Sequence, residues 1–274
     1  MDDLSDLTVR HLPTRAWGGA MNMALDAVAA ETVADGGPAS LRIYGWEPST
    51  LSLGYAQNPA TIDWDYCDAE GIDVTRRPTG GGAIYHDSIG DISYSIVLPR
   101  ERLPDDLTAA YQQLCEPLLE CFDMLGVPVQ FADVGREAAY QPSCYLRELH
   151  PAHDLVVETE DGHRKISGNA QHRQRDAVIQ HGSILFDIPV DRHLRCFTEP
   201  TADEADVTGR TTAITDHADV SREEVIETLE SMLATAFDAS PGPWRRAELD
   251  RANELVETRF GAAGWVKRRP SSEA

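Results

Sequence analysis

The chain has 274 residues, with 24 basic and 46 acidic side chains, which gives a formal net charge of −22 at pH 7. A charge of this sign repels phosphate, so nucleic acid is not an expected partner, and no apolar run of about 18 residues is present to span a membrane. The five cysteines are odd in number and scattered, which fits neither a disulfide framework nor a zinc-binding pattern.

The basic residues are almost all arginine, because Lys165 and Lys267 are the two lysines of the chain. The apolar fraction is 42%, which indicates a foldable protein rather than a disordered acidic chain. A foldable, strongly acidic and lysine-poor composition is typical of proteins kept soluble in concentrated salt. We therefore expect a halophilic protein. The N-terminal segment has no signal-peptide pattern, so the expected location is the cytoplasm.

The hydrophobic pattern predicts short strands interspersed with helices. In chain order these are a helix within 12–35, strands at 41–46, 50–55, 74–77 and 91–98, a helix at 107–125, strands at 155–158, 164–167 and 182–187, and helices from 221 and over 245–260. The strands are grouped as hairpins between helices. This grouping predicts an α+β fold in which a mixed or antiparallel sheet is flanked by helices.

Several finer expectations follow from the same pattern. Strand 50–55 is expected to pair antiparallel with strand 41–46. Strand 91–98 alternates cleanly between apolar and polar residues, so it should be half-buried. A hairpin is predicted around the Asp161-Gly162 turn, and the tail from 268 to 274 is expected to fray.

The densest chemical signal is the segment from Arg76 to Asp87, where two arginines precede three consecutive glycines. Glycines let the backbone approach a ligand closely and turn its N–H groups toward an anion. Guanidinium groups can clamp a carboxylate or a phosphate. The pattern is neither a Walker A loop nor GxGxxG. A plain glycine-rich turn is the alternative, and the adjacent arginines favour an anion site.

A second signal is Lys165, because a composition that has largely exchanged lysine for arginine still places lysine there. This indicates a role for a compact charge on a flexible stem. If residues 164–167 form a strand, Lys165 and Ser167 share one face. A solvated strand lysine is the alternative.

Cys144 lies in a loop-like stretch before this hairpin. Such a cysteine is either a nucleophile or a small buried hydrophobic residue. His86 and His181 are expected to be buried and to hold backbone groups rather than to act in catalysis. His150 and His153 lack further ligands at useful spacing, so no metal site is predicted.

Taken together, five segments resemble the lipoate-protein ligase A and octanoyltransferase superfamily, which also includes the catalytic domains of biotin-protein ligases. In order they are Met21–Asp26, Pro48–Gly54 with Gln57-Asn58, Arg76–Ala83, Lys165–Ala170 and His181–Leu185. The resemblance implies a catalytic domain of the biotin/lipoate protein ligase type over residues 1–205. Residues 206–274 would be a C-terminal helical extension of the same domain.

The resemblance implies transfer of an acyl group to one lysine of a lipoyl domain. In the ligase branch, which we expect here, lipoate and ATP with Mg²⁺ form lipoyl-adenylate before the acyl group is transferred. Lys165 would bridge the acyl carboxylate and the phosphate and stabilise the developing charge. The implied binding positions are Arg76, Arg77, Thr79, Gly80, Gly81, Gly82, Ala83, Ile84, Tyr85, Ser167 and Gly168.

In the octanoyltransferase branch no ATP is used. Cys144 would take octanoate from acyl carrier protein as a thioester and pass it to the acceptor lysine. The motifs are divided, because the segment 168–171 is more similar to this branch and the third glycine is more similar to the ligase. A non-catalytic lipoate-binding module is a further alternative.

The implied partners are lipoyl-domain proteins, such as the E2 component of 2-oxoacid dehydrogenases and the H protein of glycine cleavage. A ligase of this length would also use an accessory ligase chain. The octanoyltransferase would instead use acyl carrier protein.

Overall fold

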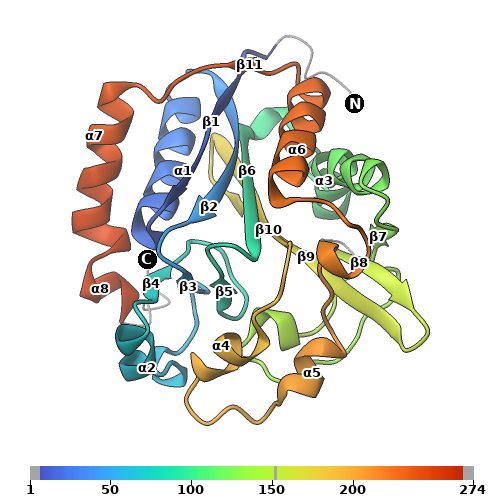
Figure 1. The fold of residues 1–274 in the computed structure, drawn as a ribbon. Helices are drawn as coiled ribbons and strands as arrows, with labels where there is room; N and C mark the ends of the chain where they lie inside the picture. Colours follow the sequence, from blue (N-terminus) through green and yellow to red (C-terminus); the bar gives the residue numbers. More distant parts are fainter. Residues whose placement is uncertain (1–6, 151–152, 268–274) are drawn as a thin grey trace.

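The computed structural model describes residues 7–150 and 153–267. The predicted fraying at 268–274 therefore lies outside the described residues. The described part of the chain forms an eight-stranded sheet in the order β11-β1-β2-β6-β10-β9-β8-β7 and a three-stranded sheet in the order β4-β3-β5 (Figure 1). The predicted α+β fold with a mixed sheet flanked by helices is confirmed.

The element bounds agree with most of the predicted segments. The strands are β1 (Val9–Trp17), β2 (Ala39–Trp46), β3 (Thr50–Leu53), β4 (Asp73–Arg76), β5 (Ile84–His86), β6 (Asp91–Pro99), β7 (Val129–Phe131), β8 (Asp154–Thr159), β9 (Gly162–Arg173), β10 (Ala177–Leu185) and β11 (Ser240–Pro241). The helices are α1 (Gly19–Ala34), α2 (Trp64–Ala69), α3 (Leu107–Met124), α4 (Val190–Arg195), α5 (Glu204–Thr208), α6 (Arg222–Ala236), α7 (Arg246–Leu255) and α8 (Ala263–Val266).

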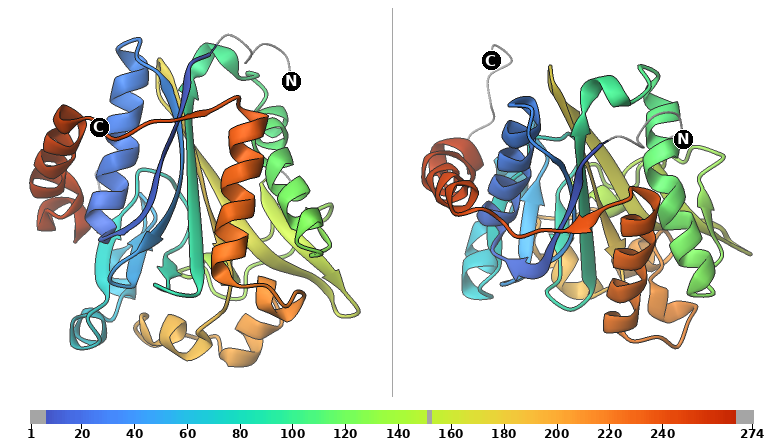
Figure 2. Two further views of the ribbon diagram at one scale, coloured as in Figure 1. Left: turned by 45° about the horizontal axis from the view of Figure 1, so that its top comes forward. Right: turned by 90° about the horizontal axis from the view of Figure 1, so that it is seen from above.

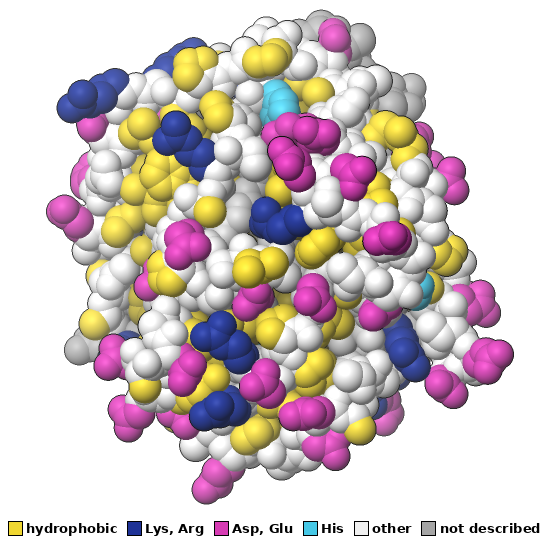
Figure 3. Space-filling view, viewed as in Figure 1, with side chains coloured by type: hydrophobic (Ala, Val, Ile, Leu, Met, Phe, Trp, Pro, Cys, Tyr) yellow, Lys and Arg dark blue, Asp and Glu magenta, His cyan; other side chains and the backbone are white. Residues whose placement is uncertain are grey.

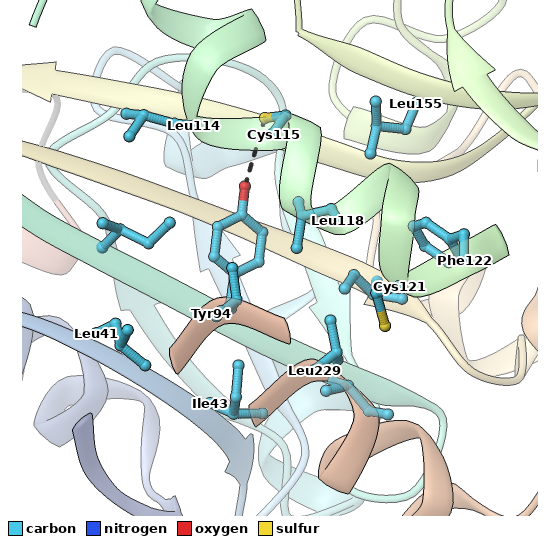
Figure 4. Close-up of a cluster of buried hydrophobic side chains, with 14 of the residues drawn as sticks. Leu41, Ile43, Tyr94, Leu114, Cys115, Leu118, Cys121, Phe122, Leu155 and Leu229 are labelled. Carbon is cyan, nitrogen blue, oxygen red and sulfur yellow. Dashed lines mark hydrogen bonds between the residues drawn. The ribbon is translucent and has the colours of Figure 1, made fainter. Parts of the chain in front are cut away.

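Helices cover both faces of the large sheet, with α1 and α7 on one side and α3 and α6 on the other (Figure 2). The main core lies between the sheet and the second pair. It includes Leu41 and Ile43 of β2, Leu118 and Phe122 of α3, and Leu229 of α6 (Figure 4). Helix α6 begins with a capping box, because the Ser221 side chain accepts the Glu224 amide and the Glu224 side chain accepts the Ser221 amide.

Two strand expectations are wrong, and each error has its own structural reason. Strand β2 already pairs with β1 on one edge and with β6 on the other. Strand β3 therefore has no free edge there, and it pairs with β4 and β5 in the small sheet. Strand β6 is buried along almost its whole length, not half-buried, because helices cover both faces. Its polar residues make buried hydrogen bonds, for example from Ser95 Oγ to Asp26 Oδ1 at 2.7 Å.

Among the described residues, no helix is both long enough and apolar enough to cross a bilayer.

Candidate active site

A cavity of about 320 Å³ lies where the small sheet meets β9 and β10. Its wall draws on both sheets and on α1. Seven of the expected site residues line it: Arg77, Gly80, Gly81, Ile84, Cys144, Lys165 and Gly168. Six others do not line it: Arg76, Thr79, Gly82, Ala83, Tyr85 and Ser167. The structure therefore gathers the two candidate reactive side chains, Cys144 and Lys165, at one cavity.

Lys165 is aimed into the cavity by an irregularity in strand β9. The register of β8 against β9 shifts between Leu155 and Val156, which pair with Ser167 and Lys165 and leave Ile166 as the extra residue. A bulge of this kind re-aims a side chain. Ile166 is packed into the core, Lys165 lines the cavity and Ser167 does not. The simple alternation expected for residues 164–167 therefore does not hold.

The ammonium group of Lys165 lies between an acid and a thiol. Its Nζ is 2.7 Å from Asp154 Oδ1 and 4.0 Å from Cys144 Sγ. Burial opposes the charge, but the Asp154 carboxylate and the Cys144 sulfur hold the pKa of Lys165 above its ordinary value. A Cβ at Gly168 would lie 2.8 Å from Lys165 Cε. Glycine at 168 therefore leaves room for the lysine stem.

Cys144 is half-buried and begins a short 3-10 turn, Cys144–Leu146. Two backbone hydrogen bonds join its loop to the glycine-rich segment. They run from Cys144 N to Ala83 O at 2.8 Å and from Ala83 N to Pro142 O at 2.7 Å. A Cβ at Gly82 would lie within 2.9 Å of backbone atoms of Gln141, Pro142 and Cys144. The third glycine thus allows two backbones to meet beside the thiol.

His193 of α4 contacts the same loop through Ser143 and Tyr145. Its Nε2 is 2.7 Å from Ser143 Oγ, next to Cys144 in the chain. Its ring also lies 4.8 Å from the ring of Tyr145. Burial lowers the pKa of His193 to about 3, so the imidazole is neutral. No sequence signal pointed to this residue.

The two neighbouring arginines have different roles in the structure. Arg77 is 4% exposed and donates to the carbonyls of Ser52, Gly80 and Gly82 at 2.7 to 2.8 Å. Its guanidinium thereby fixes the conformation of the glycine-rich segment, and Arg77 also lines the cavity. The two Nη groups of Arg77, and the Ala83 amide, thus donate to the protein's own carbonyl oxygens. Phosphate binding by this segment stays a prediction.

Arg76 points away from the cavity and acts as a structural clamp. Its guanidinium donates to the carbonyl oxygens of five residues: Gly54, Tyr55, Gln57, Trp265 and Val266. It therefore ties the C-terminal segment to the small sheet. Arg76 does not line the cavity, and its predicted role in binding stays a prediction.

Two histidines of the cavity wall hold side chains, not the backbone groups that we expected. His86 lies with Nδ1 3.0 Å from Asp91 Oδ2 and Nε2 2.9 Å from Ser52 Oγ. His181 lies with Nε2 2.9 Å from Thr79 Oγ1. Thr79 is therefore fixed behind the wall rather than exposed to a ligand. Tyr85 is also buried, and burial raises its pKa to about 12.

Among residues 7–150 and 153–267, no cluster of three or more His, Cys, Asp and Glu side chains could hold a metal ion. His150 and His153 stack on each other with ring centroids 4.4 Å apart. Both histidines line the cavity.

Comparisons with known proteins place this geometry in context. The model of the lipoyl protein ligase A/B catalytic domain matches residues 19–234. Octanoyltransferase LipM of Kyrpidia tusciae is 33% identical over 287 residues, which cover 96% of this chain and 99% of the relative. Octanoyltransferase LipM of Bacillus subtilis is 30% identical over 249 residues, which cover 85% of this chain and 87% of the relative.

Solved structures share the fold at lower identity. A chain from the bipartite lipoate protein ligase system of Thermoplasma acidophilum superposes with a TM-score of 0.79 at 22% identity, over 98% of this chain and 99% of that chain. A lipoate-protein ligase A bound with ATP superposes with a TM-score of 0.78 at 23% identity, over 96% and 100%.

Proposed function

Because the chain belongs to the lipoyl protein ligase A/B catalytic domain family, we propose that it is an octanoyltransferase that acts through a thioester on Cys144. The octanoyl group would pass from acyl carrier protein to a lysine of a lipoyl domain. The sequence motifs indicated an acyl-transfer enzyme of this family, and the chain is one. The relatives named above are octanoyltransferases, which favours this route over ATP-dependent ligation.

The observation that carries this proposal is the contact between the thiol and the ammonium group. Cys144 Sγ lies 4.0 Å from Lys165 Nζ at the cavity wall. The thiolate is the nucleophilic form of cysteine, and a fixed neighbouring cation stabilises negative charge on sulfur or on a tetrahedral intermediate. Two of the donors expected to bind phosphate in a ligase, Arg77 Nη2 and the Ala83 amide, donate to backbone carbonyls instead.

The chemistry balances without a cofactor. In the first step the Cys144 sulfur attacks the donor thioester, so that one C–S bond forms, the donor C–S bond breaks, and the carrier thiolate leaves. In the second step the acceptor amine attacks the Cys144 thioester, a C–N bond forms, and Cys144 leaves as a thiolate. The proton lost by the amine ends, overall, on the carrier thiol.

The cavity size fits a single acyl chain. A volume of about 320 Å³ lies at the lower end of the roughly 300–1,000 Å³ found for small-molecule sites. The inner wall carries the apolar side chains of Met23, Tyr44 and Trp46. These surfaces would bury a hydrocarbon chain whose carbonyl lies at Cys144.

The test is a two-donor assay with an apo lipoyl domain, read by the mass of the acceptor. One tube holds octanoyl-acyl carrier protein without ATP, and the other holds lipoate with Mg-ATP. We expect a mass gain in the first tube, its loss in Cys144→Ser, and its retention in Cys121→Ala, which removes a core thiol. Transfer by Cys144→Ser at the wild-type rate would contradict the proposal.

A second candidate is ATP-dependent lipoate ligation. It is favoured by Arg77, a buried cation in the cavity wall whose Nε has no hydrogen-bond partner among the described residues. A gain only with lipoate and Mg-ATP would assign this route, and activity only after addition of a second chain would indicate an accessory subunit. Lipoate binding without any gain would indicate the binding module.

The acceptors that we propose are lipoyl domains of E2 components and the glycine cleavage H protein. The solved neighbour from Thermoplasma acidophilum was studied together with its E2 lipoyl domain, which supports the first of these. Comparing apo E2 lipoyl domain and apo H protein in the same assay would rank the two acceptors.

We also propose that the protein is halophilic and works in a cytoplasm with a high salt concentration. Asp and Glu side chains are spread over the face shown in Figure 3, in keeping with 46 acidic and 24 basic residues. Salt screens the mutual repulsion of such charges. Melting temperatures measured from low to molar KCl should rise, and full stability in dilute buffer would contradict this proposal.

Finally, we propose that residues 206–274 extend the catalytic domain of residues 1–205 instead of forming a separate one. Helix α6 contributes Leu229 and Leu233 to the main core, and α7 contributes Leu255 to the cluster around α1. These contacts support the proposal. A chain truncated after residue 205 should therefore expose the core and fail to fold cooperatively.

A further inference from the structure

Lys165 is held by a carboxylate that no sequence motif singled out. Asp154 is the first residue of β8, opposite Gly168 of β9. It is 1% exposed, and its Oδ1 lies 2.7 Å from Lys165 Nζ. The contact joins two buried charges in the wall of the acyl cavity, so each is compensated chiefly by the other.

Asp154 is itself fixed from several directions. Its Oδ2 accepts a bond from His150 N at 2.8 Å, and its carbonyl accepts Ala132 N at 3.0 Å. The preceding carbonyl, of His153, accepts Asn169 Nδ2 at 2.8 Å. These bonds restrict the position of the Asp154 carboxylate, although the lysine side chain that it contacts is flexible. The carboxylate is therefore suited to hold a reactive group at one place.

The charges around Lys165 differ in sign. Asp154 of β8 and Cys144 of the loop favour the ammonium form, whereas Arg77 and burial oppose it. His153 is a further neighbour of the acid, with its Nδ1 3.6 Å from the same Asp154 Oδ1. The remaining charged residues of the wall, Arg147 and Glu148, pair with each other at 2.6 Å. Asp154 is thus the carboxylate in direct contact with the amine.

We propose that Asp154 is a positioning residue that holds Lys165 as an ammonium ion beside Cys144, so that Lys165 acts through its charge and not as a proton acceptor. This inference rests on the proposed function. A buried lysine without a counter-ion favours its neutral form. The Asp154 anion reverses that preference. It also keeps the cation next to Cys144, whose thiolate attacks the donor in the first step and is the leaving group in the second.

The chain offers a direct test, because it contains two lysines, Lys165 and Lys267. Protein labelled with ¹³C at lysine Cε gives two NMR signals, which Lys267→Arg assigns. In the wild type, Lys165 should titrate above an ordinary lysine. In Asp154→Asn its midpoint should fall by at least about one pH unit. In Asp161→Asn, which removes an acid 83% exposed on the same hairpin, it should not move.

Transfer kinetics supply the second readout. Asp154→Asn should lower kcat by at least about tenfold and move the alkaline limb of the pH profile to lower pH. Asp154→Glu should restore part of both, and Asp161→Asn should behave as wild type. Circular dichroism and thermal melts show whether each variant is folded.

The outcomes separate the two proposals. If the wild type transfers octanoate while Asp154→Asn matches it in rate, pH profile and Lys165 titration, the positioning role is overturned and the function stands. A folded Asp154→Asn that is slow but keeps both profiles would also overturn it, since that pattern marks a purely structural role. If the wild type transfers nothing from either donor, the proposed function falls.

Discussion

Lys165 and Cys144 meet at one cavity but come from regions of different kinds. Lys165 lies on β9, inside the eight-stranded sheet (Figure 1), where it pairs with Val156 of β8 and forms an isolated bridge to Thr211. Cys144 lies on the connection between β7 and β8, where backbone bonds to the glycine-rich segment replace a regular ladder. On the strand, the register shift at Ile166 aims the lysine into the cavity, and the Asp154 carboxylate then contacts its amine. On the loop, backbone contacts decide where the thiol lies.

The largest effect should come from the lysine itself. Lys165→Ala removes the cation beside the sulfur and leaves Asp154 as an unpaired buried charge. We expect transfer to fall by about 10²–10³-fold, whichever donor is used, in an assay of acceptor mass. Near-normal turnover by this variant would contradict its assignment to the site.

The loop side is best tested by a matched pair of glycines. At Gly82 an added Cβ would press on backbone atoms on three sides, whereas at Gly80 nothing lies within 4 Å. Gly82→Ala should displace the thiol and reduce transfer by about 10²-fold, with a loss of stability of about 1–3 kcal/mol. Gly80→Ala should retain wild-type activity and stability. If the two variants have equal transfer kinetics and equal stability in urea, the backbone contacts at Gly82 do not position the thiol.

The strand side has its own glycine test, with a smaller expected effect. A Cβ at Gly168 would meet Lys165 Cε at 2.8 Å and Nζ at 3.0 Å, both at the end of a flexible side chain. Gly168→Ala should therefore move the amine and leave the backbone in place. We expect kcat to fall by about tenfold, with little change in the melting temperature. A large loss of stability would show that the strand, not the lysine, had moved.

The last prediction concerns stability in acid and not the rate of transfer. Because burial lowers the pKa of His193 from 6.5 to about 3, protonation favours the unfolded chain. The stability linked to this histidine is present above pH 6.5 and is lost as the pH falls toward 3, by at most about 1.4 kcal/mol per pH unit. His193→Gln cannot titrate, so its free energy of unfolding, measured in urea between pH 7 and 4, should fall less steeply. Parallel curves would contradict this prediction.

Local pattern was sufficient to predict most of the elements. Helices 107–125 and 245–260 and the hairpin at Asp161-Gly162 could be predicted because their signals are periodicity, caps and turn residues, all of which are local. The partner of β3 could not, because it depends on which sheet edges are already filled. The burial of β6 depended in the same way on helices distant in the sequence.

The candidate site shows the same division. Lys165, Cys144 and the glycine-rich segment could be found from composition and motifs. Arg76 and Arg77 are identical in type and adjacent, so no local rule separates the scaffold clamp from the residue in the cavity wall. Asp154 and His193 could not be predicted as site residues, because an acid at a strand end and a histidine on a short helix are common.

The sequence by itself determined the residue types, the family and the acyl-transfer chemistry, because these depend on side chains at set spacings along the chain. Only the tertiary structure decided that the thiol and the ammonium group lie 4.0 Å apart, that Gly82 serves the contact of two backbones, and that Asp154 holds the lysine. The physical reason is that each of these depends on segments distant in the sequence that packing brings together.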